Sequence, residues 1–254
     1  MTDTSVQPTA EGTPQLSQME RVVDVFTAPS KTFTDIKNGH TSWWLPFVLF
    51  IVVGTALWAT VNAKVTWATV AENGVKMSPR AAEAMDNLKP EQRAQQMKVS
   101  AMAQAGIWAA APIFVLLMDL IGAAILLGTI NFGFGGKATF GKMLAVVWYA
   151  GLPGLIKLLI GIIGLFAGVT PDAFLPQNPA GTNLGYYMNP LEANKALYTL
   201  AVSIDPITIW SMVLLAIGVA TVAGVKRSAG YIAVFGWWVL GLIIGVGMSV
   251  VMGG

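Results

Sequence analysis

The chain has 254 residues, of which 55% are hydrophobic and 11% charged, and its formal net charge is +2. A soluble globular protein carries roughly 25% charged residues, so this composition excludes a disordered chain and argues against a soluble enzyme. No basic run follows a nucleic-acid backbone, so no nucleic-acid partner is expected. The absence of cysteine excludes disulfides and thiolate metal sites. We therefore expect an all-α integral membrane protein.

The N-terminal region predicts a polar tail followed by amphipathic helices. Residues 1–15 contain no apolar core typical of a signal peptide, so we expect a disordered tail and insertion through the first internal span. Residues 16–39 predict short helices interrupted at Pro29, the first with apolar residues at helical spacing. These apolar residues are Leu16, Met19, Val22, Val23 and Phe26. Such helices usually lie in the membrane interface, and a docking surface for a partner is the alternative.

Residues 40–254 read as one membrane domain. Several apolar segments approach the length of about 20 residues that a membrane-spanning helix needs. They predict five transmembrane helices at about residues 44–61, 106–130, 140–167, 207–225 and 231–251.

A charged segment, residues 75–105, follows the first span. Ser78-Pro79 and Lys89-Pro90 are typical helix starts, with proline at the first helical position. We expect an extramembrane helical loop. Its mixed charges are more typical of a solvated face than of a partner surface.

The second and third spans flank one short turn, which makes them antiparallel neighbours. The turn holds an amide, glycines and a lysine: Asn131, Gly133, Gly135, Gly136 and Lys137. It fails the phosphate-binding pattern G-x-x-x-x-G-K-[ST], because Asn131 replaces the first glycine and Ala138 follows the lysine. The turn suits anionic lipid head groups at the membrane surface instead.

Basic residues in the short turns predict the orientation of the chain. The turns after the second and fourth spans contain Lys137, Lys142, Lys226 and Arg227, so both are expected on the cytoplasmic side. The first loop is also rich in lysine and arginine, but long loops follow this rule less well. We expect a multi-pass protein of the bacterial inner membrane with a cytoplasmic N-terminus and a periplasmic C-terminus.

Two ionisable residues lie near the middle of spans, Asp119 in the second and Lys157 in the third. Groups at such depth usually face an interior or a partner. Counted from the turn, they are offset by four residues, or about 6 Å along a helix, which a lysine can reach across. We predict a buried ion pair that fixes the register of the hairpin, with a proton or ion relay as the alternative. Pro112 and Pro153 are expected to kink these spans for packing, or else to mark a transport site.

No catalytic residue, cofactor or metal site is predicted. His40 is the only histidine, and neither H-E-x-x-H nor G-x-S-x-G occurs.

The order of several segments resembles the bacterial branch of the Ypt-interacting-protein (Yip) family. From about Arg21 onward these segments are RVVDVFTAPSKTFTDI, WWLPF, NFGFGGKATFGKMLAVVWYAGLP, TNLGYYMNP and SIDPITIW. The resemblance implies a five-span helical domain with a cytoplasmic N-terminus. Eukaryotic members bind Rab-type GTPases in vesicle traffic, but this chain lacks their long N-terminal region and D-L-Y-G-P-type motif, FTAPS being the nearest stretch. Some bacterial relatives resemble accessory membrane subunits encoded beside MacB-type ABC exporters and their periplasmic adaptors.

The leading hypothesis is a non-enzymatic inner-membrane protein that binds and modulates a membrane complex such as an ABC exporter, with residues 75–105 contacting a periplasmic adaptor or the permease. The alternative is a small transporter, channel or lipid-handling protein that uses Asp119 and Lys157. A GTPase-binding traffic factor is a weaker alternative, which rests on family analogy alone. Membrane lipids are expected partners. The sequence leaves open whether the chain forms a homo-oligomer.

Overall fold

The computed structural model describes residues 15–189 and 192–252, and the predicted tail, residues 1–15, lies almost wholly outside these ranges. Every element within them is helical, and five of the helices are long and apolar enough to cross a membrane. The fold class predicted from the sequence is confirmed. The candidate spans are α3 (Trp44–Lys64), α7 (Ala111–Phe134), the segment Phe140–Ala167, α11 (Pro206–Ala223) and α12 (Arg227–Met252).

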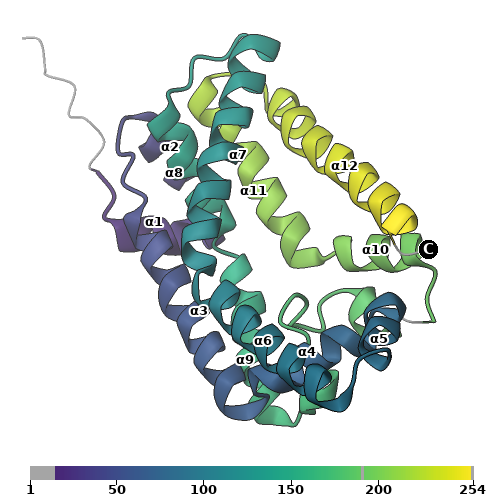
Figure 1. Ribbon diagram of the computed structural model, residues 1–254. Helices are drawn as coiled ribbons and strands as arrows, with labels where there is room; N and C mark the ends of the chain where they lie inside the picture. Colours follow the sequence, from purple (N-terminus) through teal and green to yellow (C-terminus); the bar gives the residue numbers. More distant parts are fainter. Residues whose placement is uncertain (1–14, 190–191, 253–254) are drawn as a thin grey trace, which may run out of the picture.

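The third span is broken and connects the two halves of the molecule. Its halves are α8 (Phe140–Gly151) and α9 (Gly154–Ala167), and the break falls at Pro153, where a kink was predicted. The first half, α8, packs against α7 and α11, whereas α9 packs against α3. Figure 1 shows the resulting arrangement, with α7, α11 and α12 in the upper part and α3 and α9 in the lower part.

The first loop folds into three helices beside the lower part: α4 (Trp67–Lys76), α5 (Pro79–Asp86) and α6 (Pro90–Ala109). The chain turns sharply after α3 at Thr66, a non-glycine residue with a φ of 73°, and α4 returns to pack on α6. Ser78 caps α5 as its sequence indicated, because its hydroxyl accepts a hydrogen bond from the Ala81 amide. A break at Ala110 separates α6 from α7, and Pro112 lies in the first turn of α7.

The core lies where α2, α8 and α11 meet. Trp148 and Tyr149 of α8 are fully buried there. Gly218 of α11 permits the close approach, since a Cβ atom at this position would lie 2.5 Å from Val146 and 2.9 Å from Phe33. Buried residues make up 44% of the apolar window of α11 but 6% of that of α12. The fourth span is therefore central, and α12 is peripheral.

The N-terminal helices, α1 (Gln18–Thr27) and α2 (Pro29–Lys37), pack against this core. In α2, Phe33 and Ile36 are fully buried. The predicted apolar stripe is not the side of α1 that the protein buries: Met19 and Val23 are 60% and 54% exposed, whereas Arg21 and Val25 are buried. The exposed apolar face is compatible with the predicted membrane interface, which stays a prediction.

A buried ionic network explains why Arg21 points inward. Its Nε lies 2.9 Å from Oδ2 of Asp35, and its Nη1 donates to the backbone carbonyl oxygens of His40 and Ser42. The other Asp35 oxygen, Oδ1, lies 2.8 Å from Nδ1 of His40. The guanidinium also lies over the ring of Tyr149, 5.8 Å from its centroid. This network joins α1, α2 and the approach to α3 to the centre of α8.

Asp35→Asn should destabilise the protein by about 3–5 kcal/mol, because it leaves the buried Arg21 guanidinium without its counter-charge. The matched control is Asp24→Asn. Asp24 also pairs with a basic residue at 2.9 Å, but Lys31 is 58% exposed, so the control should cost at most about 1 kcal/mol. Thermal unfolding of both variants in detergent measures the difference. Equal melting temperatures would contradict the structural role given to the network.

Candidate functional site

The structure corrects the predicted partner of Lys157. Its ammonium lies 3.1 Å from Oδ2 of Asp205, and no ion pair joins it to Asp119 within the residues described. The prediction assumed two straight antiparallel spans, whereas the third span bends at Pro153 before it reaches Lys157. The loop after the third span then folds back and brings Asp205 to the lysine.

Asp205 is fully buried and serves as the N-cap of α11. Its Oδ1 accepts hydrogen bonds from the amides of Ile207 and Thr208, at 2.9 and 3.1 Å. Its Oδ2 accepts a 2.5 Å hydrogen bond from the Thr182 hydroxyl as well as the contact from Lys157. A carboxylate at a helix N-terminus also interacts favourably with the helix dipole. This carboxylate is therefore satisfied without water.

An asparagine pair extends the cluster into the loop. Asn178 and Asn183 exchange side-chain hydrogen bonds of 3.2 and 2.8 Å, and both residues are buried. Asn183 also accepts from the Tyr186 amide and so caps the short helix η2 (Leu184–Tyr187). On the other side of the loop, the side-chain amide of Asn73 in α4 donates to the backbone carbonyls of Pro171 and Phe174. Side-chain amides thus give a loop without long helices a defined shape.

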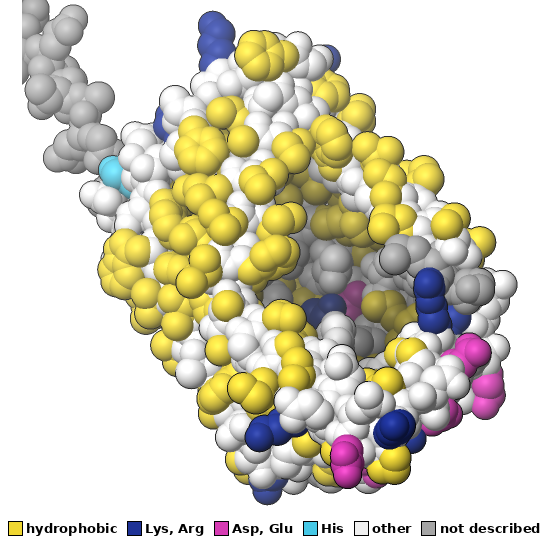
Figure 2. Space-filling model, viewed as in Figure 1, with side chains coloured by type: hydrophobic (Ala, Val, Ile, Leu, Met, Phe, Trp, Pro, Cys, Tyr) yellow, Lys and Arg dark blue, Asp and Glu magenta, His cyan; other side chains and the backbone are white. Residues whose placement is uncertain are grey.

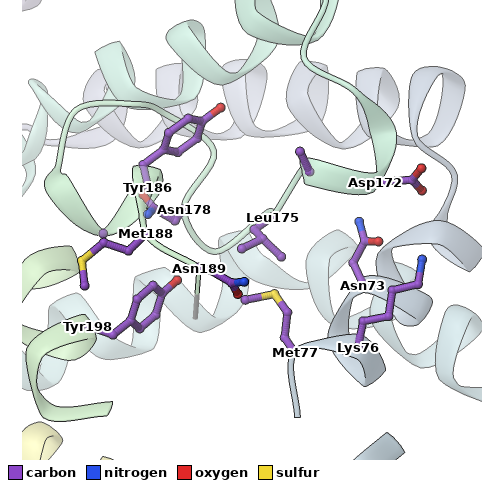
Figure 3. A pocket seen from close by; sticks show the side chains of 12 residues that line it. Asn73, Lys76, Met77, Asp172, Leu175, Asn178, Tyr186, Met188, Asn189 and Tyr198 are labelled. Carbon is purple, nitrogen blue, oxygen red and sulfur yellow. The ribbon is translucent and has the colours of Figure 1, made fainter. Parts of the chain in front are cut away.

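This loop, α4 and α10 (Lys195–Ser203) enclose a polar pocket of about 260 Å³. Figure 3 shows Asn73 and Lys76 of α4 at one end of the pocket and Tyr186 and Tyr198 at the other. Asp172 and Asn178 also line it, and the buried side-chain Oδ1 of Asn73 receives no hydrogen bond from the residues that the structure describes. With one cation, one anion, amides and phenols, the pocket can bind water or a small polar molecule that carries both charges. Within the described residues no group of histidine and acidic side chains could hold a metal ion.

Asp119 lies apart from this cluster, on the inward side of α7. It continues, at helical spacing, the buried stripe Ala123, Leu126 and Ile130. It is half-buried and forms no hydrogen bond or ion pair in the part of the chain that the structure describes. Figure 2 shows this face hollowed between α7 and α12, with apolar side chains around the opening and charged side chains inside. An unpaired carboxylate on the inner side of a span is a functional candidate.

The turn between the second and third spans is built by the residues that the sequence singled out. The side chain of Asn131 bonds both the amide and the carbonyl of Ala138, at 3.0 and 2.9 Å. Gly135 ends α7 with a φ of +70°, and the Lys137 amide donates to Ala223 at the end of α11. Gly133 lies in the last turn of α7, and the side chain of Lys137 is exposed. The turn therefore has a structural role, and binding of its lysine to lipid head groups stays a prediction.

Sequence reasoning missed Asp205 as the partner of Lys157, although an acidic residue before proline, as in Asp205-Pro206, is typical of a helix start. The sequence feature that could have indicated this pairing is the acidic N-cap. A carboxylate at the start of an apolar helix needs a cation as partner when the loop before it is buried.

Asp205→Asn should destabilise the protein by about 3 kcal/mol, because asparagine keeps the cap but leaves Lys157 without its counter-charge. Adding Lys157→Met should restore part of the loss, and a double-mutant cycle in thermal unfolding measures the coupling. Asp119→Asn is the matched control and should leave the stability nearly unchanged. Coupling of Lys157 to Asp119 rather than to Asp205 would contradict this geometry.

Comparison with known proteins gives one family match. A family model described as the Yip1 domain matches residues 23–253, which is most of the chain. No curated protein and no solved structure matches the chain.

Proposed function

The chain belongs to the Yip1 domain family of membrane proteins, and from this premise we propose that it is a non-enzymatic protein that binds and modulates a membrane complex. The observation that carries the proposal is the exposed helical platform formed by α5 and α6. The proposed location is the bacterial inner membrane, with the N-terminus cytoplasmic and the platform on the periplasmic side.

The platform is held firmly but leaves one face uncovered. Trp58 of α3 donates its indole N–H to the carbonyl of Ala105, which fixes the C-terminal part of α6, and α4 packs along one side. An ion pair of 3.1 Å between Arg93 and Asp86 joins α6 to α5. The uncovered side of α6 presents Val99 and Met102, which are 48% and 66% exposed and lie one helical turn apart. Apolar side chains among charges on a fixed helix favour a protein partner.

An ABC-type exporter with its periplasmic adaptor is the complex to test first, because the resemblance to bacterial accessory subunits implies it. A small GTPase, as for eukaryotic members of the family, is the weaker candidate. Assembly of the chain with itself is measured in the same experiment.

Val99→Glu combined with Met102→Glu should reduce co-purification of exporter subunits on the order of tenfold, because a buried interface excludes unpaired charge. The matched control is Met19→Glu combined with Val23→Glu, which places the same charge on two similarly exposed residues one turn apart in α1. Tagged proteins are purified from native membranes in mild detergent, and the partners are quantified by mass spectrometry. Both variants must elute as a single species. Recovery of the wild-type chain alone, or equal partner loss in both variants, would contradict the proposal.

A second candidate function is transport through the hollow between α7 and α12, and the observation that favours it is the unpaired Asp119 on the inner side of α7. If this carboxylate relays protons, Asp119→Asn should abolish proton flux into proteoliposomes while leaving the melting temperature unchanged. Flux is followed with a pH-sensitive dye under a potassium diffusion potential. Asp24→Asn is the control, and undiminished flux in Asp119→Asn would exclude the relay.

A further inference from the structure

A second pocket, of about 450 Å³, lies beside α3 and is apolar along most of its length. It is lined by residues from α3, from α4, from the junction of α6 and α7, from α8 and α9, and from the loop after α9. Those used below are Phe50, Gly54, Trp58, Trp67, Trp108 and Trp148. It is separate from the polar pocket next to Asn73, with which it shares no lining residue.

Two helix breaks create this space. The break at Ala110 turns α7 away from α6, and the break before Gly154 turns α9 away from α8. Between these breaks α3 makes few contacts with α7. On the wall formed by α3, Gly54 has no heavy atom within 4 Å of the position where a Cβ atom would lie. The pocket is therefore a property of the backbone path rather than of one side-chain conformation.

The lining is mostly apolar and offers water few polar partners. A water molecule needs two or more polar partners, and the indole N–H of Trp58 is already bonded to the Ala105 carbonyl. Most of the lining residues belong to candidate spans, on α3, α7, α8 and α9, so the medium around this part of the pocket is lipid. Its apolar component is the acyl chain, which fills such a space without a polar penalty.

The length and the ends of the pocket indicate how a lipid would lie in it. Its α3 wall runs from Phe47 to Val61, about 21 Å at 1.5 Å per residue, and one leaflet of the hydrocarbon core is about 15 Å deep. Trp58, Trp67 and Trp108 gather at the end where α3 stops, and tryptophan favours the head-group level. Lys64 lies one turn beyond Val61 at this end. The buried indole N–H groups of Trp67 and Trp148 both have no acceptor in the part of the chain described, and of the two only Trp67 lies at the end where α3 stops, where an ester carbonyl can accept.

We propose that this pocket binds one acyl chain of a membrane phospholipid, with the ester group beside Trp67 and the chain end beside Phe50 and Trp148. The bound chain completes the packing between α3 and the rest of the domain. The proposal is independent of the platform on α6 and of the polar pocket.

The test introduces a side chain that fills the pocket from its α3 wall. Gly54→Leu places a side chain where nothing lies within 4 Å, and Gly241→Leu in α12, which is equally open, is the matched control. Full-length proteins are reconstituted in phosphatidylcholine vesicles that contain phosphatidylglycerol with a diazirine at the end of one acyl chain. After illumination, labelled peptides are quantified by mass spectrometry. We expect labelling of α3 and α8 near Phe50 and Trp148, reduced on the order of tenfold by Gly54→Leu and unchanged by Gly241→Leu.

Three outcomes would overturn the proposal. Equal labelling of α3 and α8 in Gly54→Leu would show that the label comes from surrounding lipid. Labelling mainly on the exposed face of α12 would also show that the label comes from surrounding lipid. Loss of the label when unlabelled free fatty acid is added, but not when phospholipid is added, would identify a different occupant. If Gly54→Leu does not elute as a single species, native mass spectrometry of the unmodified protein decides: one retained phospholipid supports the proposal, and the bare chain contradicts it.

Discussion

The carboxylate of Asp205 is the group on which the lower half of the molecule depends. It has no exposure to solvent, so each of its oxygen atoms must find partners within the protein. The partners come from α9, from the first turn of α11 and from the loop between them, through Lys157, Thr208 and Thr182. One ionised group therefore fixes the start of the central span, the bend of the third span and the shape of the loop. The polar pocket beside Asn178 exists because this loop is held in place.

A second buried charged group, Arg21, holds several segments together near the N-terminal end of the chain. Arg21 is buried against Asp35, and its remaining donors bind backbone carbonyls that have no helical partner. Buried ion pairs gain little stability relative to apolar packing, but they discriminate strongly against arrangements that separate the charges. Two such pairs, one between the N-terminal helices and one at the start of α11, give this apolar protein a specific arrangement that hydrophobic contacts between spans cannot supply in lipid.

Much of the fold could be predicted from the sequence, because the length of an apolar segment and the position of a proline determine the helix that contains them. The five spans follow from hydrophobicity, and the chain breaks at Pro153 and begins α5 after Ser78. The partner of Lys157 could not be predicted in this way. The prediction counted residues outward from a turn, which assumes that both helices are straight. A bend changes which residues of the two helices lie at the same depth in the membrane. The inward direction of Arg21 also escaped prediction, because helical periodicity places a charge outside unless a distant partner is known. Within the candidate site, the sequence singled out Lys157 but not its partner, and the fold of the loop depends on the buried Asp205.

The contact between α2 and α11 has a consequence for how the protein is made. Phe33 and Ile36 reach their buried positions only after Pro206–Ala223 has been synthesised, and the whole chain from Asn38 to Asp205 lies between them. At about 5–20 residues per second, the ribosome needs on the order of ten seconds for this interval. During that time no part of the protein covers the apolar face of the N-terminal helices. Such a face inserts favourably into the membrane interface. The amphipathic pattern of residues 16–39 then serves the nascent chain first, and the finished bundle later buries Phe33 and Ile36 of this region in its core.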